Sequence, residues 1–155
     1  MILLFLDIDG VIINRQSSTI RYDNANPDCV ARLNGFIRQT GAKIVVIGAW
    51  RIGRTVSELQ KILDGWGVEG VVIGKAPQGP HGCQRADEIE VFLRDWEGPT
   101  IQSFVMLSDD ADFGQFLTHL VRTRFESGLT VNDLEMAIKI LENRKGPSIN
   151  STRPI

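Results

Sequence analysis

The sequence predicts one α/β domain, a three-layer α/β/α sandwich around a mostly parallel, Rossmann-like sheet. Short apolar runs alternate with segments of helical periodicity through most of the 155 residues. The runs are continuously apolar, which is typical of strands buried on both faces. The length suits a single hydrophobic core. We therefore predict one domain over residues 1–144, followed by a flexible tail over residues 145–155 that is rich in Gly, Pro, Asn and Ser.

The first elements follow from local signals. Residues 2–6 read Ile-Leu-Leu-Phe-Leu, a short buried strand. Residues 11–25 have mixed character and are expected to form a loop or short flap, too small to be a cap domain. Asn26 before a proline predicts the start of a helix, with Asn as N-cap and Pro at the first helical position. Gly41 is the expected stop of that helix.

The rest of the chain repeats the alternation of strand and helix. The last helix starts at Thr130, which is spaced from Asp133 as a capping box. The apolar patterns predict strands over residues 43–47, 71–73, 104–107 and 119–121, and helices over residues 56–63, 89–96 and 130–141.

Composition narrows the class of protein. The net charge of −2 gives no general field for polyanions, so a nucleic-acid contact would need a local basic patch. Cys29 and Cys83 lack ligand spacing and are expected to be reduced, as in the cytoplasm. The apolar start is interrupted by Asp7 and Asp9, a poor signal peptide, and no run approaches the roughly 18 residues of a membrane span. We expect a soluble, cytoplasmic protein with no membrane partner.

Two pairs of carboxylates follow predicted strands. Asp7 and Asp9 come after the first strand, and Asp109 and Asp110 after a later one. Ligands of open parallel sheets bind outside the carboxyl ends of the strands, so four carboxylates converge if these strands are neighbours. Such a cluster needs a cation, and hard oxygen ligands favour Mg²⁺, which also holds substrate phosphate. Taken singly, each motif is also compatible with a polar turn or an acidic helix cap.

The segment Leu4-Phe5-Leu6-Asp7-Ile8-Asp9-Gly10-Val11 resembles the first motif of haloacid-dehalogenase-like (HAD) phosphohydrolases. The resemblance implies that Asp7 is the nucleophile, forming an aspartyl-phosphate, and that Asp9 is the general acid and base. It also implies Mg²⁺ bound by Asp7, by the backbone carbonyl of Asp9 and by Asp109, with Asp110 as the second candidate for the acidic ligand.

A closer resemblance is to the small HAD domains of RNA-repair proteins, and it spans residues 1 to about 143. It is carried by Trp50-Arg51 after the second strand and by the segments 85–89, 107–112, 121–123 and 128–130. It implies that Arg85 balances the aspartates, with Lys75 as its competitor. It also implies a phosphate site at Gly48, Ala49 and Arg51, although a salt-bridged Arg51 is the alternative. Trp50 is expected to be a core residue rather than a platform for bases.

The chain departs from the family after the second strand. The family has a Ser or Thr that holds the phosphate, whereas this chain reads Ile47-Gly48-Ala49. Backbone N–H groups at Gly48 and Ala49 remain as donors. Loss of one oriented donor to a transition-state oxyanion costs about 10²–10³ in rate. We therefore expect weak activity that Gly48→Ser would increase.

The resemblance predicts a Mg²⁺-dependent phosphomonoester hydrolase with an open site, and nucleic-acid 3′-phosphate ends are its candidate substrates. Two other classes of function stay open. The missing hydroxyl is compatible with a non-catalytic domain that binds phosphate or a partner protein. The acidic cluster is also compatible with a Mg²⁺-dependent nuclease.

Overall fold

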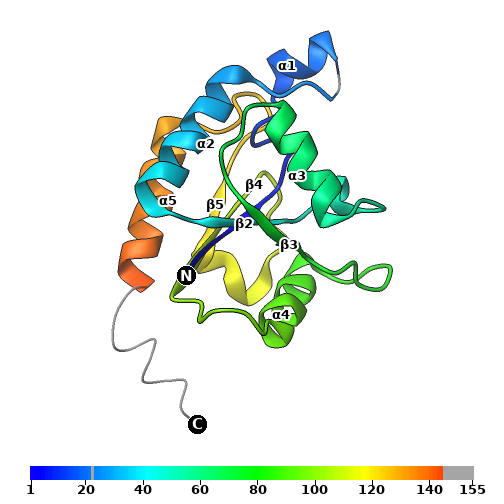
Figure 1. The fold of residues 1–155 in the computed structure, drawn as a ribbon, viewed down its shortest axis with the longest axis vertical. Helices are drawn as coiled ribbons and strands as arrows, with labels where there is room; N and C mark the ends of the chain where they lie inside the picture. Colours follow the sequence, from blue (N-terminus) through cyan, green and yellow to red (C-terminus); the bar gives the residue numbers. More distant parts are fainter. Residues whose placement is uncertain (22, 145–155) are drawn as a thin grey trace.

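The computed structural model describes residues 1–21 and 23–144, and the predicted tail over 145–155 lies outside them. Its centre is a five-stranded sheet in the order β3-β2-β1-β4-β5 (Figure 1). All four strand pairs are parallel, which confirms the predicted sheet. The strands are β1 (Ile2–Leu6), β2 (Lys43–Val46), β3 (Val72–Lys75), β4 (Ser103–Ser108) and β5 (Leu120–Arg122).

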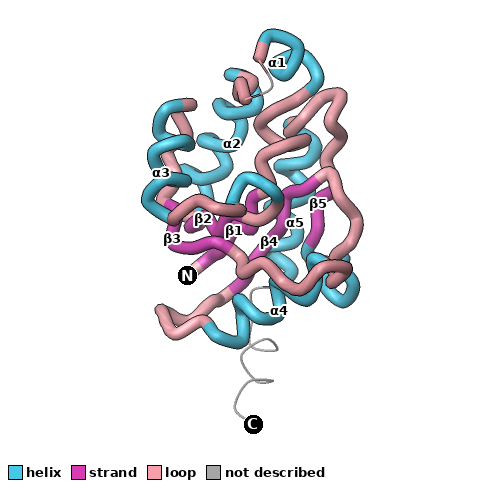
Figure 2. Tube along the Cα trace, turned by 90° about the vertical axis from the view of Figure 1, so that its right-hand side faces the viewer, coloured by secondary structure: helices cyan, strands magenta, loops and turns pink. Residues whose placement is uncertain are grey.

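Helices cover both faces of the sheet. The α-helices are α1 (Arg15–Ile20), α2 (Pro27–Thr40), α3 (Val56–Gly65), α4 (Arg85–Asp95) and α5 (Val131–Arg144), and the 3₁₀ helices are η1 (Ala49–Arg51) and η2 (Gly114–His119). The cores show that α2, α3 and α5 pack on one face and α4 on the other. Figure 2 shows the strands between α2 and α3 on one side and α4 on the other. The three-layer sandwich is confirmed.

The apolar runs are continuous because each strand supplies side chains to two hydrophobic cores, one on each face of the sheet. In β1, Leu4 and Leu6 belong to the core under α2, α3 and α5. Leu3 and Phe5 belong to the second core, which includes Ile89 of α4. These four residues of β1 have no exposed surface. Alternate residues of a strand point to opposite faces, so burial on both sides leaves no polar position in the run.

The predicted caps of two helices are present. The Asn26 side chain accepts hydrogen bonds from the N–H groups of Asp28 and Cys29 at the start of α2. That helix ends at Gly41, whose φ of 69° is left-handed. At α5, Thr130 and Asp133 exchange the two hydrogen bonds of a capping box. The sequence was right about where these two helices begin.

The predicted loop over residues 11–25 contains the short helix α1. Asn14 caps it, and Asn14 and Ser17 exchange backbone and side-chain hydrogen bonds. The preceding residues 11–13 are buried in the core. No apolar period extends over a six-residue helix, so the sequence pattern did not reveal it. The segment is too short for a cap domain, as expected.

The order of the strands predicts where a ligand would bind. From β1 the chain builds outward through β2 to β3, then returns to the other side of β1 for β4 and β5. The crevice outside the carboxyl ends of β1 and β4 is therefore the topological switch point of the sheet, where ligands of open α/β folds bind.

Candidate active site

Asp7 is buried at the carboxyl end of β1, where 4% of its surface is exposed. The Ser108 hydroxyl donates to Oδ2 at 2.8 Å, and the Ile8 N–H donates to Oδ1 at 2.9 Å. Nη2 of Arg85 lies 3.7 Å from Oδ2. Burial raises the pKa of Asp7 to about 6, because lost hydration outweighs the stabilisation by Arg85 and the two hydrogen bonds. The nearby positive charge does not fully compensate this carboxylate.

Asp109 lies at the same edge, because Leu6 of β1 pairs with Leu107 of β4. Its carboxylate packs against Gly10, where a Cβ would lie 2.3 Å from Oδ2. Burial raises the pKa of Asp109, and the charges of Asp110 and Asp9 raise it further. The charge of Asp109 in turn raises the pKa of Asp7. Two desolvated, mutually repelling carboxylates form an oxygen donor set that fits Mg²⁺.

The other two carboxylates have different partners. Asp110 accepts a hydrogen bond from Nε of Arg85 at 3.0 Å, and Asp9 accepts one from the indole N–H of Trp50 at 3.1 Å. Within residues 1–21 and 23–144, no three His, Cys, Asp or Glu side chains are grouped closely enough to hold an ion. The charges of Asp9 and Asp110 nevertheless raise the pKa of Asp109, and the charge of Asp109 raises the pKa of Asp7, so the four carboxylates lie near one another, and their role as metal ligands stays a prediction. The residues fit an ion bound by Asp7, Asp109, the Asp9 carbonyl and several waters.

Arg85, and not Lys75, lies with the aspartates. Arg85 is the first residue of α4, and its guanidinium contacts both Asp7 and Asp110. Although burial alone would raise it, the pKa of Asp110 is lowered by the Ala111 N–H and by Arg85. Nζ of Lys75 instead donates to the carbonyl of Arg54 at 2.5 Å. The structure thus separates two candidates that the sequence left open.

Arg51 is buried and turned into the protein. Its guanidinium donates to the carbonyls of Gly48 at 2.6 Å and Ala76 at 2.8 Å, and it pairs with Glu88 at 2.8 Å. Only 5% of its surface is exposed. The structure shows the salt-bridged alternative, so we assign Arg51 the role of holding the loops after β2 and β3 rather than contacting substrate.

Gly48 brings the backbone directly against Asp7. Its φ is 85°, a left-handed conformation that side chains other than Gly rarely adopt. A Cβ there would lie 2.2 Å from Oδ1 of Asp7 and 3.3 Å from Nη1 of Arg85. Among the described residues, no hydrogen bond engages the N–H of Gly48 or of Ala49. This geometry argues against the expectation that Gly48→Ser would increase activity, because a side chain at this position would collide with Asp7.

Two hydroxyl residues of the site were missed as functional residues in the sequence. Ser108 is fully buried, donates to Asp7 and accepts from the Asp110 N–H at 3.1 Å. Thr123 donates to the Gly10 carbonyl at 2.7 Å and so holds the loop that carries Asp9. Ser108 is the last residue of β4 and Thr123 directly follows β5, at the edge where Asp7 lies, and that position was the available signal.

Ser108→Ala is expected to impair the site without unfolding the protein. The change removes the donor to Asp7, in a buried hydrogen bond, and the acceptor for the Asp110 N–H, in a partly buried one, and each contributes about 1 kcal/mol to stability. We expect a loss of about 1–2 kcal/mol in the free energy of unfolding, measured by urea denaturation. Ser103→Ala is the control, because the buried Ser103 hydroxyl, on the same strand, has no partner within the described residues. Equal losses in both variants would contradict the assigned role of Ser108.

Comparison with known proteins decides the family. The family model of the HAD domain in Swiss Army Knife RNA repair proteins matches residues 3–134. The chain belongs to this family. The match runs from β1 into α5, so every residue of the candidate site lies inside the HAD domain.

The search of curated proteins found no match. One crystal structure aligns with 91% of this chain and 81% of its own, at 12% identity and a TM-score of 0.47. Among the described residues, no helix has the length and apolarity that a membrane crossing requires.

Proposed function

We propose that this HAD domain is a Mg²⁺-dependent phosphomonoester hydrolase that acts through an aspartyl-phosphate on Asp7. The observation that carries the proposal is the environment of Asp7 at the switch point of the sheet. Its carboxylate is buried, oriented by Ser108 and Ile8, and lies beside Arg85. A carboxylate held in one orientation is a competent nucleophile, because attack requires little further reorganisation.

The reaction divides into two displacements. In the first, a carboxylate oxygen of Asp7 attacks phosphorus, the ester oxygen leaves, and Asp9 protonates it. In the second, Asp9 removes a proton from water, which attacks the aspartyl-phosphate and releases inorganic phosphate and free Asp7. In this proposal, Arg85 and the N–H groups of Gly48 and Ala49 stabilise negative charge on the phosphoryl oxygens. Mg²⁺ bound at Asp7 and Asp109 would neutralise charge between carboxylate and phosphate.

The position of Asp9 fits its role as acid and base. The residue is exposed, so water and a leaving group can reach it. The Trp50 indole N–H holds its carboxylate at 3.1 Å, and the loop behind it is closed by a hydrogen bond between the Gly10 N–H and the Ile13 carbonyl at 2.8 Å. An exposed but oriented carboxyl group is suited to exchanging a proton with solvent in each cycle.

A cationic pocket beside Asp109 favours a substrate with further phosphates. The pocket is lined by Asp109, Arg122, Thr123, Arg124 and Phe125. Arg122 and Arg124 are exposed, and Nε of Arg122 donates to the Asp109 carbonyl at 3.1 Å. This is the local basic patch that a chain of net charge −2 needs for nucleic acid. Together with the family, it supports a nucleic-acid end, with the 3′-phosphate as the first candidate.

The alternative is a domain that binds phosphate or a partner without turnover. The observation behind it is Gly48, because the hydroxyl expected there is absent and the Ser108 hydroxyl is engaged by Asp7. An enzyme that relies on backbone donors is expected to be slow by about 10²–10³.

The test is phosphate release with Mg²⁺ from p-nitrophenyl phosphate and from 3′- and 5′-phosphorylated oligonucleotides. We expect slow release, fastest from the 3′-phosphorylated strand and abolished by EDTA. Binding of the oligonucleotides without release from any substrate would favour the binding domain. Cleavage inside the strand, with no free phosphate, would favour a nuclease.

A further inference from the structure

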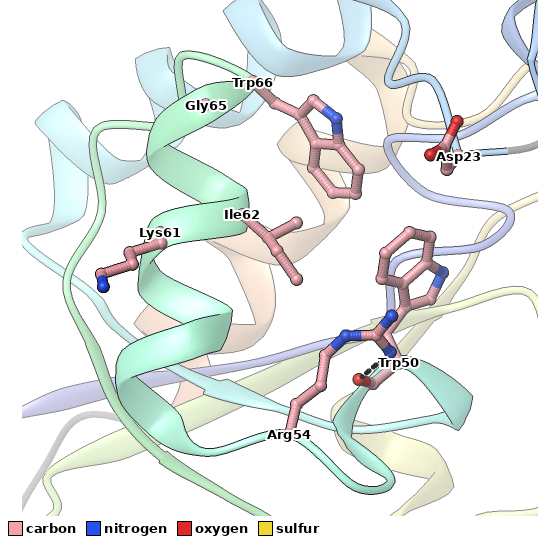
Figure 3. Close-up of a pocket in the computed structure, with 7 residues that line it drawn as sticks. All are labelled: Asp23, Trp50, Arg54, Lys61, Ile62, Gly65 and Trp66. Atoms are coloured by element: carbon pink, nitrogen blue, oxygen red, sulfur yellow. Dashed lines mark hydrogen bonds between the residues drawn. The ribbon is translucent and has the colours of Figure 1, made fainter.

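A pocket lined by aromatic and cationic side chains lies between η1 and α3 and shares no lining residue with the basic patch. Its cavity volume of about 440 Å³ is within the range of small-molecule sites. It is lined by Asp23, Trp50, Arg54, Lys61, Ile62, Gly65 and Trp66 (Figure 3).

Two indoles and a guanidinium form one wall of this aromatic pocket. The rings of Trp50 and Trp66 meet edge to face, with centroids 5.2 Å apart and an interplanar angle of 76°. The Arg54 guanidinium lies 4.9 Å from the centroid of the Trp50 ring and donates to the Trp50 carbonyl at 3.0 Å. Figure 3 shows the guanidinium against the Trp50 ring, and it shows the Ile62 side chain extending from α3 toward the two indoles. Both indoles are only partly buried, so part of their surface is free for a ligand.

The pocket lies on the leaving-group side of the candidate active site. The Trp50 indole that forms its wall donates to Asp9. In the proposed reaction Asp9 protonates the ester oxygen of the leaving group, so that group extends from Asp9. The part of the substrate attached to the phosphate therefore meets the wall formed by Trp50 and Trp66.

We propose that this pocket binds the terminal nucleoside of a phosphorylated nucleic-acid strand, with its base stacked on the indole wall. The inference rests on the proposed function and specifies its substrate. Every base has a π face that stacks on indole or guanidinium, and Arg54 adds a positive charge for the adjacent phosphate. The Asp23 carboxylate pairs with Arg21 at 3.1 Å, and its remaining lone pairs can accept from amino or hydroxyl groups of the nucleoside. Trp50, expected to be only a core residue, thus has a second role.

The experiment measures binding alone, in an Asp7→Asn background that cannot form the phosphoenzyme. The probe is a fluorescein-labelled, 3′-phosphorylated tetranucleotide, titrated by fluorescence anisotropy. We expect Trp66→Leu to weaken binding roughly ten- to a hundredfold, as loss of one base–aromatic stack does. Trp66→Phe keeps a ring and should restore affinity to within about threefold.

Trp96→Leu is the matched control. Trp96 also belongs to an aromatic pair, stacked on Phe92 at 5.6 Å, but it follows α4 on the opposite face of the sheet. Its loss should leave affinity for the tetranucleotide unchanged. Equal effects of Trp66→Leu and Trp96→Leu, or no binding of the tetranucleotide by the parent protein at millimolar concentration, would overturn the proposal.

Hydrolysis of p-nitrophenyl phosphate, measured in parallel with Asp7 intact, separates this inference from the proposed function. Hydrolysis together with tetranucleotide binding that is insensitive to Trp66→Leu overturns the nucleoside pocket and leaves the phosphatase. Binding that is lost in Trp66→Leu, without hydrolysis of any substrate, supports the pocket and overturns the phosphatase.

Discussion

Asp7→Asn is expected to abolish phosphate release while leaving the fold intact. The amide has nearly the shape of the carboxylate. Its oxygen can still accept the hydrogen bond from the Ile8 N–H, and its NH₂ group can donate to the Ser108 hydroxyl. It cannot act as the nucleophile, so the covalent route is lost. We expect the rate to fall by about 10⁴ or more, to the background of the assay, because removing one member of a catalytic group costs about as much as removing all of them. Phosphate release from p-nitrophenyl phosphate measures the effect.

Stability serves as the control for Asp7→Asn. Burial raises the pKa of Asp7 to about 6, above the ordinary value of 3.8. The folded state then holds a proton that the unfolded state has released, so this group lowers the stability of the metal-free protein as pH rises from about 4 to about 6. At pH 7 without Mg²⁺ the variant should therefore melt no earlier than the parent. Earlier melting, or activity retained in the variant, would contradict the assignment of Asp7.

Gly48→Ser is expected to lower activity strongly, although it restores the residue type of the family. The new Cβ would lie 2.2 Å from Oδ1 of Asp7, so the nucleophile or the backbone must move. A displacement of about 1 Å in a reacting group costs about 10² in rate. Serine also has to adopt a φ near 85°, at a cost of about 1–3 kcal/mol. The kinetics of phosphate release and urea denaturation measure the two effects.

Gly82→Ser separates strain from collision. Gly82 has a φ of 86°, almost the same as Gly48, but no atom lies within 4 Å of its ideal Cβ. The control variant should lose stability to a similar extent and keep its activity. Increased phosphate release in Gly48→Ser would show that the backbone after β2 rearranges to accept a hydroxyl, and the geometry proposed for the site would then be wrong.

The sequence could predict the elements that depend on local pattern. Continuous apolar runs indicated buried parallel strands, and Asn26 and Thr130 indicated where helices begin. The placement of Asp7 and Asp109 at one edge followed from strand ends alone. These features depend on residue type and spacing, and none of them requires knowledge of where a side chain points.

The details of the site depend on side-chain direction and backbone conformation. Arg51 and Arg85 are the same residue type near strand ends, yet one turns into buried carbonyls and the other toward the aspartates. The left-handed φ of Gly48 and the hydrogen bond from Ser108 to Asp7 join segments that are far apart in the chain. Residue spacing does not encode such contacts, so the sequence did not reveal the hydrogen bonds of Asp9 to Trp50 and of Asp110 to Arg85, and Ser108 was overlooked.

The strand order has a consequence for biosynthesis. β1 pairs with β4, and Ile2 has its partner at Ser103. During translation, about two thirds of the chain must therefore be synthesised before β1 can form this pair. Pairing between residues so far apart in the sequence slows folding, because the entropy of closing the loop is lost before the contacts that stabilise the pair can form. Until Ser103 leaves the ribosome, the apolar edge of β1 lacks its native neighbour, and an incomplete nascent chain is vulnerable to aggregation.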